Sequence, residues 1–530
     1  MEIIKIPFEQ VPQLAFKDMA YANADPRLRP FYKYDVSLEA FGQVIEDKKS
    51  NTTNRAVLVE VLREQYKSFK INDKVQQNIE SLLNENTFTV VTAHQPVLFT
   101  GPLFYIYKII STINLAEQLN NHYPNYHFVP FFINGGEDHD FEEVNNATVF
   151  NKKIEWQSGE KGPVGRMKTA SLTPVLEELK QVLGESEHAQ HLYQLAETAY
   201  TSQEYYGLAT LHFVNELFKE YGLVALGTNR VALKRLFMPI MEEELLQQSS
   251  QPLVEATQQE LEKLGFGSQA HVRDINLFYL RPQIRERIVR EGDTFKVLNT
   301  DYTFTKEEII QELHEHPEHF SPNVVLRPLL QETILPNLAY IGGGGEIAYW
   351  LERKSQFEHF GVNFPMLIRR NSALWVDKGA SSRMEKLELE VNNLFQDTET
   401  LIKYYIDRNT EGELSLTAEK NTLENLFNQI AEKAKNVDMT LEKAVLAEGA
   451  KQLKTLEQIE GRIVRAEKQK HETALNQIRA LRDKLFPNNG LQERSDNFMS
   501  IYVKYGQEFF DVLKANLDPM DKRFVIILDK

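Results

Sequence analysis

The chain contains no cysteine among its 530 residues. Disulfide bonds, thiolate nucleophiles, cysteine-ligated zinc sites and iron–sulfur clusters are therefore excluded. Long hydrophobic runs are also missing, since the apolar run at 128–133 is far shorter than the about 20 residues that span a bilayer. The first residues include Glu2 and no long apolar stretch, unlike a secretory signal. We therefore expect a cytoplasmic protein with no membrane partner.

Positive charge is in short supply. Lys and Arg number 60 against 76 Asp and Glu, for a formal net charge of -16. General binding to nucleic acid or to an anionic membrane needs a broad basic surface, so neither partner is expected. The hydrophobic fraction of 42% is ordinary for a globular protein with a large core.

Proline is absent between Met366 and Phe486, and this segment is rich in Glu, Lys, Leu, Ala and Gln. Apolar residues there recur three or four positions apart, which is typical of long helices with a narrow apolar seam. The clearest stripes are Leu387, Val391 and Leu394, and Leu453, Leu456, Ile459, Ile463 and Ala466. A single helix over 438–485 would be about 70 Å long and would have to pair within the chain or with a second copy.

Turn residues divide the helical region. Residues 409–412 and 436–439 predict turns between helices, and Gly449 and Gly461 argue against one unbroken helix. A breaker cluster at 486–490 ends the region, and the apolar end of the chain predicts a strand that returns to a sheet. The predicted domains are a core at 1–374, a helical coiled-coil domain at 375–486 and a returning segment at 487–530.

A strand, a helix and a second strand follow one another in the first part. Residues 87–92 are typical of a buried strand, residues 103–119 carry a helical apolar stripe, and residues 126–133 predict a second strand. Such a unit winds right-handed, and open α/β sheets bind ligands at the carboxyl ends of their strands. The fold class is therefore α/β, and the polar segments after these strands are site candidates.

More strands are predicted further along. Residues 223–226, 324–327 and 338–341 have the composition of core strands. Residues 270–305 contain short runs that are typical of antiparallel strands, with a hairpin turn at 291–293. We interpret this stretch as an antiparallel insert on the main fold.

The segment after the second strand places acids around one imidazole: Glu137, Asp138, His139 and Asp140 follow two glycines. Three roles suit them, namely proton transfer by a histidine that a carboxylate tunes, a magnesium site for a phosphate substrate, and recognition of an ammonium group. The alternative is an acidic loop that caps the next helix.

The segment after the first strand offers His94 and Gln95, and then Gly101 ahead of a helix. Backbone amides there suit a phosphate or carboxylate, and Tyr107 and Lys108 lie on the first turns of that helix. A plain connecting loop with a solvated lysine is the alternative.

Four consecutive glycines, Gly342, Gly343, Gly344 and Gly345, precede Glu346 and an apolar helix. They permit close backbone approach and an amide nest for an anion, although the pattern is neither GxGxxG nor a Walker loop. A permissive turn is the alternative.

Arginines gather in the predicted insert. We interpret Arg281, Arg285, Arg287 and Arg290 as a solvated strand face, whereas Arg327 is attached to a predicted core strand and suits a carboxylate or phosphate.

Five segments together resemble one family, the cysteine-adding enzymes of bacillithiol biosynthesis (the BshC family). They are TAHQPVLFTGPLFYIYKIIST, INGGEDHDFEEVNNATVF, INLFYL, NVVLRPLLQETILPNLAYIGGGGEIAYWLE and LFPNNGLQER. The resemblance implies a Rossmann-like core related to class I cysteinyl-tRNA-synthetase-type enzymes, connecting inserts, and a coiled-coil domain that forms a homodimer. It also implies a ligase that forms an amide bond between L-cysteine and glucosaminyl-malate, the last step of bacillithiol synthesis.

Joining an amine to a carboxylate is uphill in water, so the resemblance implies activation of the cysteine carboxylate, with ATP expected and Mg²⁺ a candidate ion. No ligand set for zinc is spelled out. Amino-acid binding or proton transfer is expected from Glu137, Asp138, His139, Asp140, His94 and Gln95. Nucleotide contacts are expected from Gly101, Tyr107, Lys108, Gly342, Gly343, Gly344, Gly345 and Glu346. Arg327 is expected to bind an anionic substrate.

The chain departs from the family pattern at two places. The family usually has Thr-Gly-Gln-Gln where this chain has Thr92, Ala93, His94 and Gln95, and it usually has proline where Gly344 stands. Two other functions stay open: a metal-dependent hydrolase, which lacks the HExxH spacing, and a coiled-coil scaffold with a degenerate nucleotide-binding core.

Overall fold

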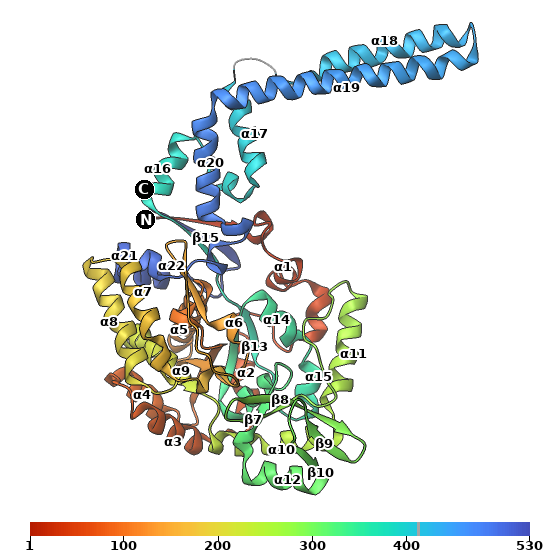
Figure 1. Ribbon diagram of the computed structural model, residues 1–530. Helices are drawn as coiled ribbons and strands as arrows, with labels where there is room; N and C mark the ends of the chain where they lie inside the picture. Colours follow the sequence, from red (N-terminus) through yellow and green to blue (C-terminus); the bar gives the residue numbers. More distant parts are fainter. Residues whose placement is uncertain (411–413) are drawn as a thin grey trace. The chain divides into compact units, whose positions relative to one another are not determined.

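The structure, a computed structural model, describes residues 1–410 and 414–530 (Figure 1). The chain divides into a larger unit, residues 3–374 and 491–527, and a smaller unit built mainly from residues 375–490. Within the described residues, no helix combines the length and the apolar character needed to cross a bilayer.

A five-stranded parallel sheet organises the larger unit, in the order β13-β12-β2-β3-β6. Its strands are β2 (Thr87–His94), β3 (His127–Asn134), β6 (Val224–Gly227), β12 (Asn337–Gly342) and β13 (Met366–Arg369). The helix α5 (Phe104–His122) connects β2 to β3, so the predicted strand–helix–strand unit is confirmed. The predicted strands near 223 and 338 are confirmed as β6 and β12.

The core of this sheet follows from its composition. Val90 on β2, Leu338 and Ile341 on β12 and Ile368 on β13 are at most 1% exposed. They pack with the apolar face of α2 (Phe41–Lys49) and the last turns of α5. Strands covered by helices on both faces become continuous apolar runs, which is the pattern that made them predictable.

The insert is a five-stranded antiparallel sheet in the order β10-β9-β8-β7-β11. Its strands are β7 (Leu277–Arg281), β8 (Ile284–Glu291), β9 (Thr294–Val297), β10 (Thr303–Thr305) and β11 (Phe320–Pro322). The predicted hairpin turn between β8 and β9 is confirmed. The helix α12 (Lys306–Glu315) leads from β10 towards β11.

The predicted strand at 324–327 is wrong. Arg327 begins a helix, α13 (Arg327–Ile334), with Pro328 in its first turn. Proline suits that position because it has no N–H to leave unpaired there. A short apolar run does not by itself distinguish a strand from a buried helix end.

The smaller unit is helical. Its helices are α16 (Lys378–Lys386), α17 (Thr398–Asn409), α18 (Thr417–Lys435), α19 (Met439–Lys470) and α20 (Glu472–Leu485). α18 and α19 run side by side as a hairpin (Figure 1), and the turn predicted at 436–439 joins them. The other predicted turn, at 409–412, extends into 411–413 and lies partly outside the described residues.

The helices of this unit depart from the sequence patterns at two places. The stretch 438–485, where Gly449 and Gly461 argued against one unbroken helix, is interrupted at His471, between α19 and α20, and at neither glycine. The stripe from Leu387 to Leu394 falls after α16, in a loop and a short 3-10 turn. Gly449 lies inside α19 and does not break the helix. A Cβ added there would lie 2.9 Å from the Cβ of Phe427 on α18. The glycine therefore permits the two helices to approach.

The end of the chain forms β15 (Arg523–Leu528), as predicted. It lies between β1 (Glu2–Pro7) and β14 (Ala373–Val376) in a three-stranded sheet. The chain passes through β14 before it enters the helices of the smaller unit.

Candidate functional site

The carboxyl ends of β2, β3 and β12 open into one cavity of about 710 Å³ in the larger unit. Ala93, His94 and Gln95 line it after β2, and Gly135, Asp138 and His139 line it after β3. Gly343, Gly344, Gly345 and Glu346 line it after β12. The two polar segments expected to meet therefore do so: Gln95 Nε2 donates to Asp138 Oδ2 at 3.0 Å.

Asp138 is the centre of a charged network. Its Oδ1 lies 3.3 Å from Arg285 Nη1, and its Oδ2 lies 3.7 Å from Arg327 Nη2. Burial alone would raise the pKa of the Asp138 carboxyl, but both guanidiniums and the hydrogen bonds from Gln95 and the His139 N–H hold it well below its usual range. Asp138 is therefore an anion that orients two arginines, and it is a poor proton acceptor.

His139 is half-exposed beside this network. Its Nδ1 accepts from Arg285 Nη1 at 2.5 Å, so its Nε2 carries the proton. Burial and the charge of Arg285 lower the pKa of His139. His139 is therefore a neutral imidazole whose Nε2–H can donate into the cavity.

The other two acids of the segment lie elsewhere. Glu137 is 5% exposed, does not line the cavity and accepts from Lys234 Nζ at 2.8 Å. Burial alone would raise the pKa of Glu137, but Lys234 keeps it lowered. Asp140 is exposed, also outside the cavity lining, and directly precedes α6 (Phe141–Val144) without a side-chain capping bond. Of the three acids, the fold thus brings Asp138 into the cavity.

His94 packs against the rings of Phe104 and Tyr105, with centroids 5.4 and 5.1 Å away. Its Nδ1 donates to the Gln95 carbonyl at 3.2 Å, which leaves the lone pair on Nε2. Burial, reinforced by the charge of Lys108, lowers the pKa of His94 to about 4. It is a neutral imidazole with a free acceptor nitrogen.

Lys108 is buried and does not line the cavity. Its Nζ donates to the Ala93 carbonyl and to Glu346 Oε1 at 2.7 Å. Tyr340 Oη and the Gly343 N–H also donate to Glu346, at 2.7 and 2.8 Å. Burial alone would raise the pKa of Glu346, but Lys108 and these donors keep it lowered. The pair ties the end of β2 to the glycine turn.

Three other expected nucleotide residues lie outside the cavity lining: Gly101, Tyr107 and Gly342. Gly101 has φ +59, and a Cβ there would lie 2.5 Å from Val97 Cγ1, so its glycine serves the local turn. At Gly344 a Cβ would overlap the side chain of Asp18, so Asp18 occupies the space that any larger residue would need.

Apart from Arg327, which was expected to bind an anion and does line the cavity, the arginines of the site were missed by the sequence analysis. Six arginines line the cavity: Arg273, Arg285, Arg287, Arg327, Arg370 and Arg494. The solvated-face interpretation is wrong for Arg285, whose side chain is 3% exposed and lies 3.9 Å from the centroid of the Phe278 ring. The two-residue spacing of Arg285 and Arg287 on β8 was a usable signal, because it places both on one face. The lining carboxylates, Asp138 and Glu346, are already paired with cations.

Comparisons with known proteins agree with this architecture. Residues 1–371 match the family model "Bacillithiol biosynthesis BshC, N-terminal Rossmann-like domain" and residues 373–528 match "Bacillithiol biosynthesis BshC, C-terminal coiled-coil domain". A protein of Flavobacterium johnsoniae is 42% identical over 96% of both chains. One of Christiangramia forsetii is 41% identical over 96% of this chain and 95% of its own. One of Cytophaga hutchinsonii is 37% identical over 97% of both.

Each of these relatives bears the name "Putative cysteine ligase BshC". Both family models are matched in the order that the structure displays, with a parallel-sheet unit first and a helical unit after it. The chain therefore belongs to the BshC family of bacillithiol biosynthesis, with a Rossmann-like domain followed by a coiled-coil domain.

Proposed function

We propose that the chain is a ligase that joins the carboxylate of L-cysteine to the amine of glucosaminyl-malate within this cavity. The observation that carries the proposal is the gathering of six arginines at the strand ends of a chain whose net charge is -16. Guanidiniums pair with carboxylates and phosphates in two-pronged geometry, so the cavity suits a polyanionic substrate such as a malyl group or a nucleotide.

The chain's own residues supply binding and orient the reacting groups. Asp138 holds Arg285 and Arg327 in place for an anionic group. When the amine nitrogen attacks the activated carbonyl carbon, the nitrogen must lose a proton. Nε2 of His94, at the cavity wall, accepts a hydrogen bond from that N–H and orients it, and the proton leaves to solvent because the lowered pKa of His94 makes the imidazole a weak base. His139 donates from its Nε2 to an oxygen of the substrate.

ATP, when bound, would supply the activation that turns the carboxylate oxygen into a leaving group. The lining glycines Gly343, Gly344 and Gly345 and the arginines suit its phosphates. The described lining suits Mg²⁺ less well, because its two carboxylates are paired with Lys108 and with arginines. The lining also offers no converging zinc ligands among the described residues, because the ligand atoms of His94, His139 and His271 do not lie within reach of one ion.

The decisive experiment incubates the purified protein with cysteine and glucosaminyl-malate, with and without ATP, and measures the thiol product by mass spectrometry. We expect product only with ATP. Product without any nucleotide would reject ATP activation, and no product under either condition would reject the ligase. Hydrolysis that needs no ATP and stops with a chelator would favour the metal-dependent hydrolase instead.

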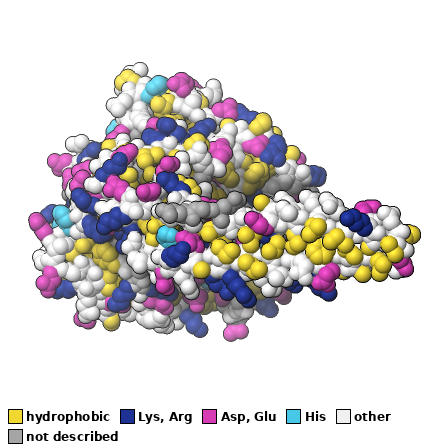
Figure 2. Space-filling view, turned by 90° about the horizontal axis from the view of Figure 1, so that it is seen from above, with side chains coloured by type: hydrophobic (Ala, Val, Ile, Leu, Met, Phe, Trp, Pro, Cys, Tyr) yellow, Lys and Arg dark blue, Asp and Glu magenta, His cyan; other side chains and the backbone are white. Residues whose placement is uncertain are grey.

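We further propose that the protein acts in the cytoplasm as a homodimer through the α18–α19 hairpin. Figure 2 displays hydrophobic side chains along this hairpin. Its exposed apolar residues are Leu426, Ile430, Val437, Met439, Leu441, Leu446, Ile459 and Ile463. A row of this kind on a two-helix hairpin supports pairing with a second copy of the same helices.

A further inference from the structure

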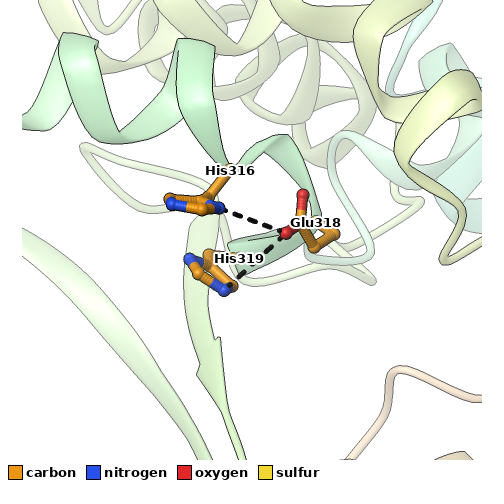
Figure 3. A group of neighbouring side chains, drawn as sticks. All are labelled: His316, Glu318 and His319. Atoms are coloured by element: carbon orange, nitrogen blue, oxygen red, sulfur yellow. Dashed lines mark ion pairs between the residues drawn. The ribbon is translucent and has the colours of Figure 1, made fainter.

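Two histidines and a glutamate meet on the short turn (Pro317–His319) that connects α12 to β11 (Figure 3). His316 Nδ1 lies 3.4 Å from Glu318 Oε1, and His319 Nε2 lies 3.9 Å from the same oxygen. One ligand atom from each of the three residues falls within 4.8 Å of the others. None of the three lines the large cavity.

The orientation of His319 is set by a second carboxylate. Its Nδ1 lies 2.7 Å from Glu312 Oε1 on α12, which fixes the proton on Nδ1 and leaves the lone pair on Nε2. A carboxylate that holds the far side of a ligand imidazole is the usual outer partner of a protein metal site. The His319 Nε2 lone pair and the Glu318 Oε1 atom are both acceptors, and one cation between them would satisfy both.

We propose that His316, Glu318 and His319 bind a divalent transition-metal ion of the zinc class. Two imidazoles with one carboxylate are a common zinc ligand set, and tetrahedral zinc places neighbouring ligand atoms about 3.3 Å apart. The separations of 3.4 and 3.9 Å are close to that value, and rotation of the exposed His316 ring can close the remaining gap. Water would complete the coordination on the exposed side.

One cation already competes for this position. Arg281 Nη1 donates to His319 Nε2 at 3.2 Å, and Arg281 Cζ lies 5.6 Å from the centroid of the Tyr279 ring. The metal ion would displace this contact, while the ring faces of Tyr279 and Tyr302 continue to hold the guanidinium.

The ion would serve as a structural clamp on the insert. β11 pairs with β7, and β7 pairs with β8, the strand that carries Arg285 and Arg287. A metal bound at the turn would fasten the end of α12 to this sheet and so restrain the strands that supply arginines to the cavity.

The test is calorimetric titration of Zn²⁺ into the full, tag-free, chelator-treated chain, with thermal melting in parallel. We expect one ion per chain and a raised melting temperature. His319→Ala and His316→Ala should weaken binding by at least about 100-fold, and Glu312→Gln by about 10–100-fold. Arg281→Met should tighten binding, because it frees Nε2. His316 is exposed, so His316→Ala should fold even if a change at His319 does not.

The matched control is His314→Ala. His314 forms a neighbouring exposed pair with Glu242, at 3.0 Å, outside the proposed site, so this variant should bind Zn²⁺ as the unaltered chain does. Absence of saturable Zn²⁺ binding, binding that His316→Ala leaves unchanged, or equal loss in His314→Ala would overturn the proposal.

Discussion

Two regions of the molecule depart from the usual distribution of side chains in opposite senses. Near the strand ends of the larger unit, the charged groups of Glu137, Lys234 and Lys108 are buried. In the hairpin of the smaller unit, apolar side chains such as Ile459 and Val437 are exposed. A buried charge is tolerable only with a partner inside the protein, whereas an exposed apolar row gains stability from a partner outside it. The first region is therefore ordered by pairing inside the protein, and the second supports the proposed pairing with a second copy.

The internal pairing is broken most severely by Lys234→Met. This change leaves the Glu137 carboxylate buried without its cation, so the free energy of unfolding should fall by about 3–5 kcal/mol in urea titrations. The double variant with Glu137→Leu removes both charges and should recover most of the loss. A single variant as stable as the unaltered chain would contradict the dependence of Glu137 on Lys234.

Asp138→Asn sharpens the contrast between neighbouring acids. The amide no longer holds Arg285 and Arg327 by charge, and misplaced binding groups cost about 100-fold in rate. We expect kcat/KM for product formation to fall by about that factor when it is measured well below the melting temperature, which should also fall because the buried Arg285 loses its anion. Asp140→Asn, at an exposed position outside the cavity lining, should change kcat/KM by less than about 2-fold, because it displaces no binding group. Equal losses in both variants would reject the central place of Asp138.

Ile459→Glu tests the exposed row of the hairpin. Burial of an isoleucine side chain in an interface contributes about 1.5–3 kcal/mol, so a charge there should weaken the dimer at least about 10-fold. Sedimentation velocity across a concentration series measures the change. Gln458→Glu adds the same charge at the preceding exposed position and is the control. If both variants associate as the unaltered chain does, the row is not the dimer contact.

The smallest expected effect is the contribution of His94 to the pH dependence of the free energy of unfolding. Its pKa is about 4 in the folded chain against an ordinary value of 6.5, so the unfolded chain takes up the proton first as the pH falls. The stability contribution is complete above pH 6.5 and is lost as the pH falls towards 4. Between pH 7 and 5.5 we expect a loss on the order of 1 kcal/mol. His94→Gln, which replaces the imidazole by a group that does not titrate, should remove this part of the slope, and an unchanged slope would contradict the burial of the imidazole.

Much of the architecture could be predicted from local patterns. The strands β2, β3, β6 and β12, the helix α5 and the turn between α18 and α19 each combine a clear apolar period with turn residues at their ends. The same reasoning failed at Arg327, where an apolar run belonged to the start of a helix. Local patterns also failed to predict the break at His471, because neither proline nor glycine marks the end of α19.

The amino-acid sequence by itself determined which segments end at the ligand-binding edge of the sheet, because periodicity and turn chemistry are local properties. It also determined the helical character of the second unit. Only the tertiary structure decided that Asp138 reaches the cavity while Glu137 pairs with Lys234, and that Arg285 is buried beside Asp138 rather than solvated. The reason is physical: the environment of a charge depends on residues distant in the chain, and no local pattern records which of two adjacent carboxylates will find its cation inside the fold.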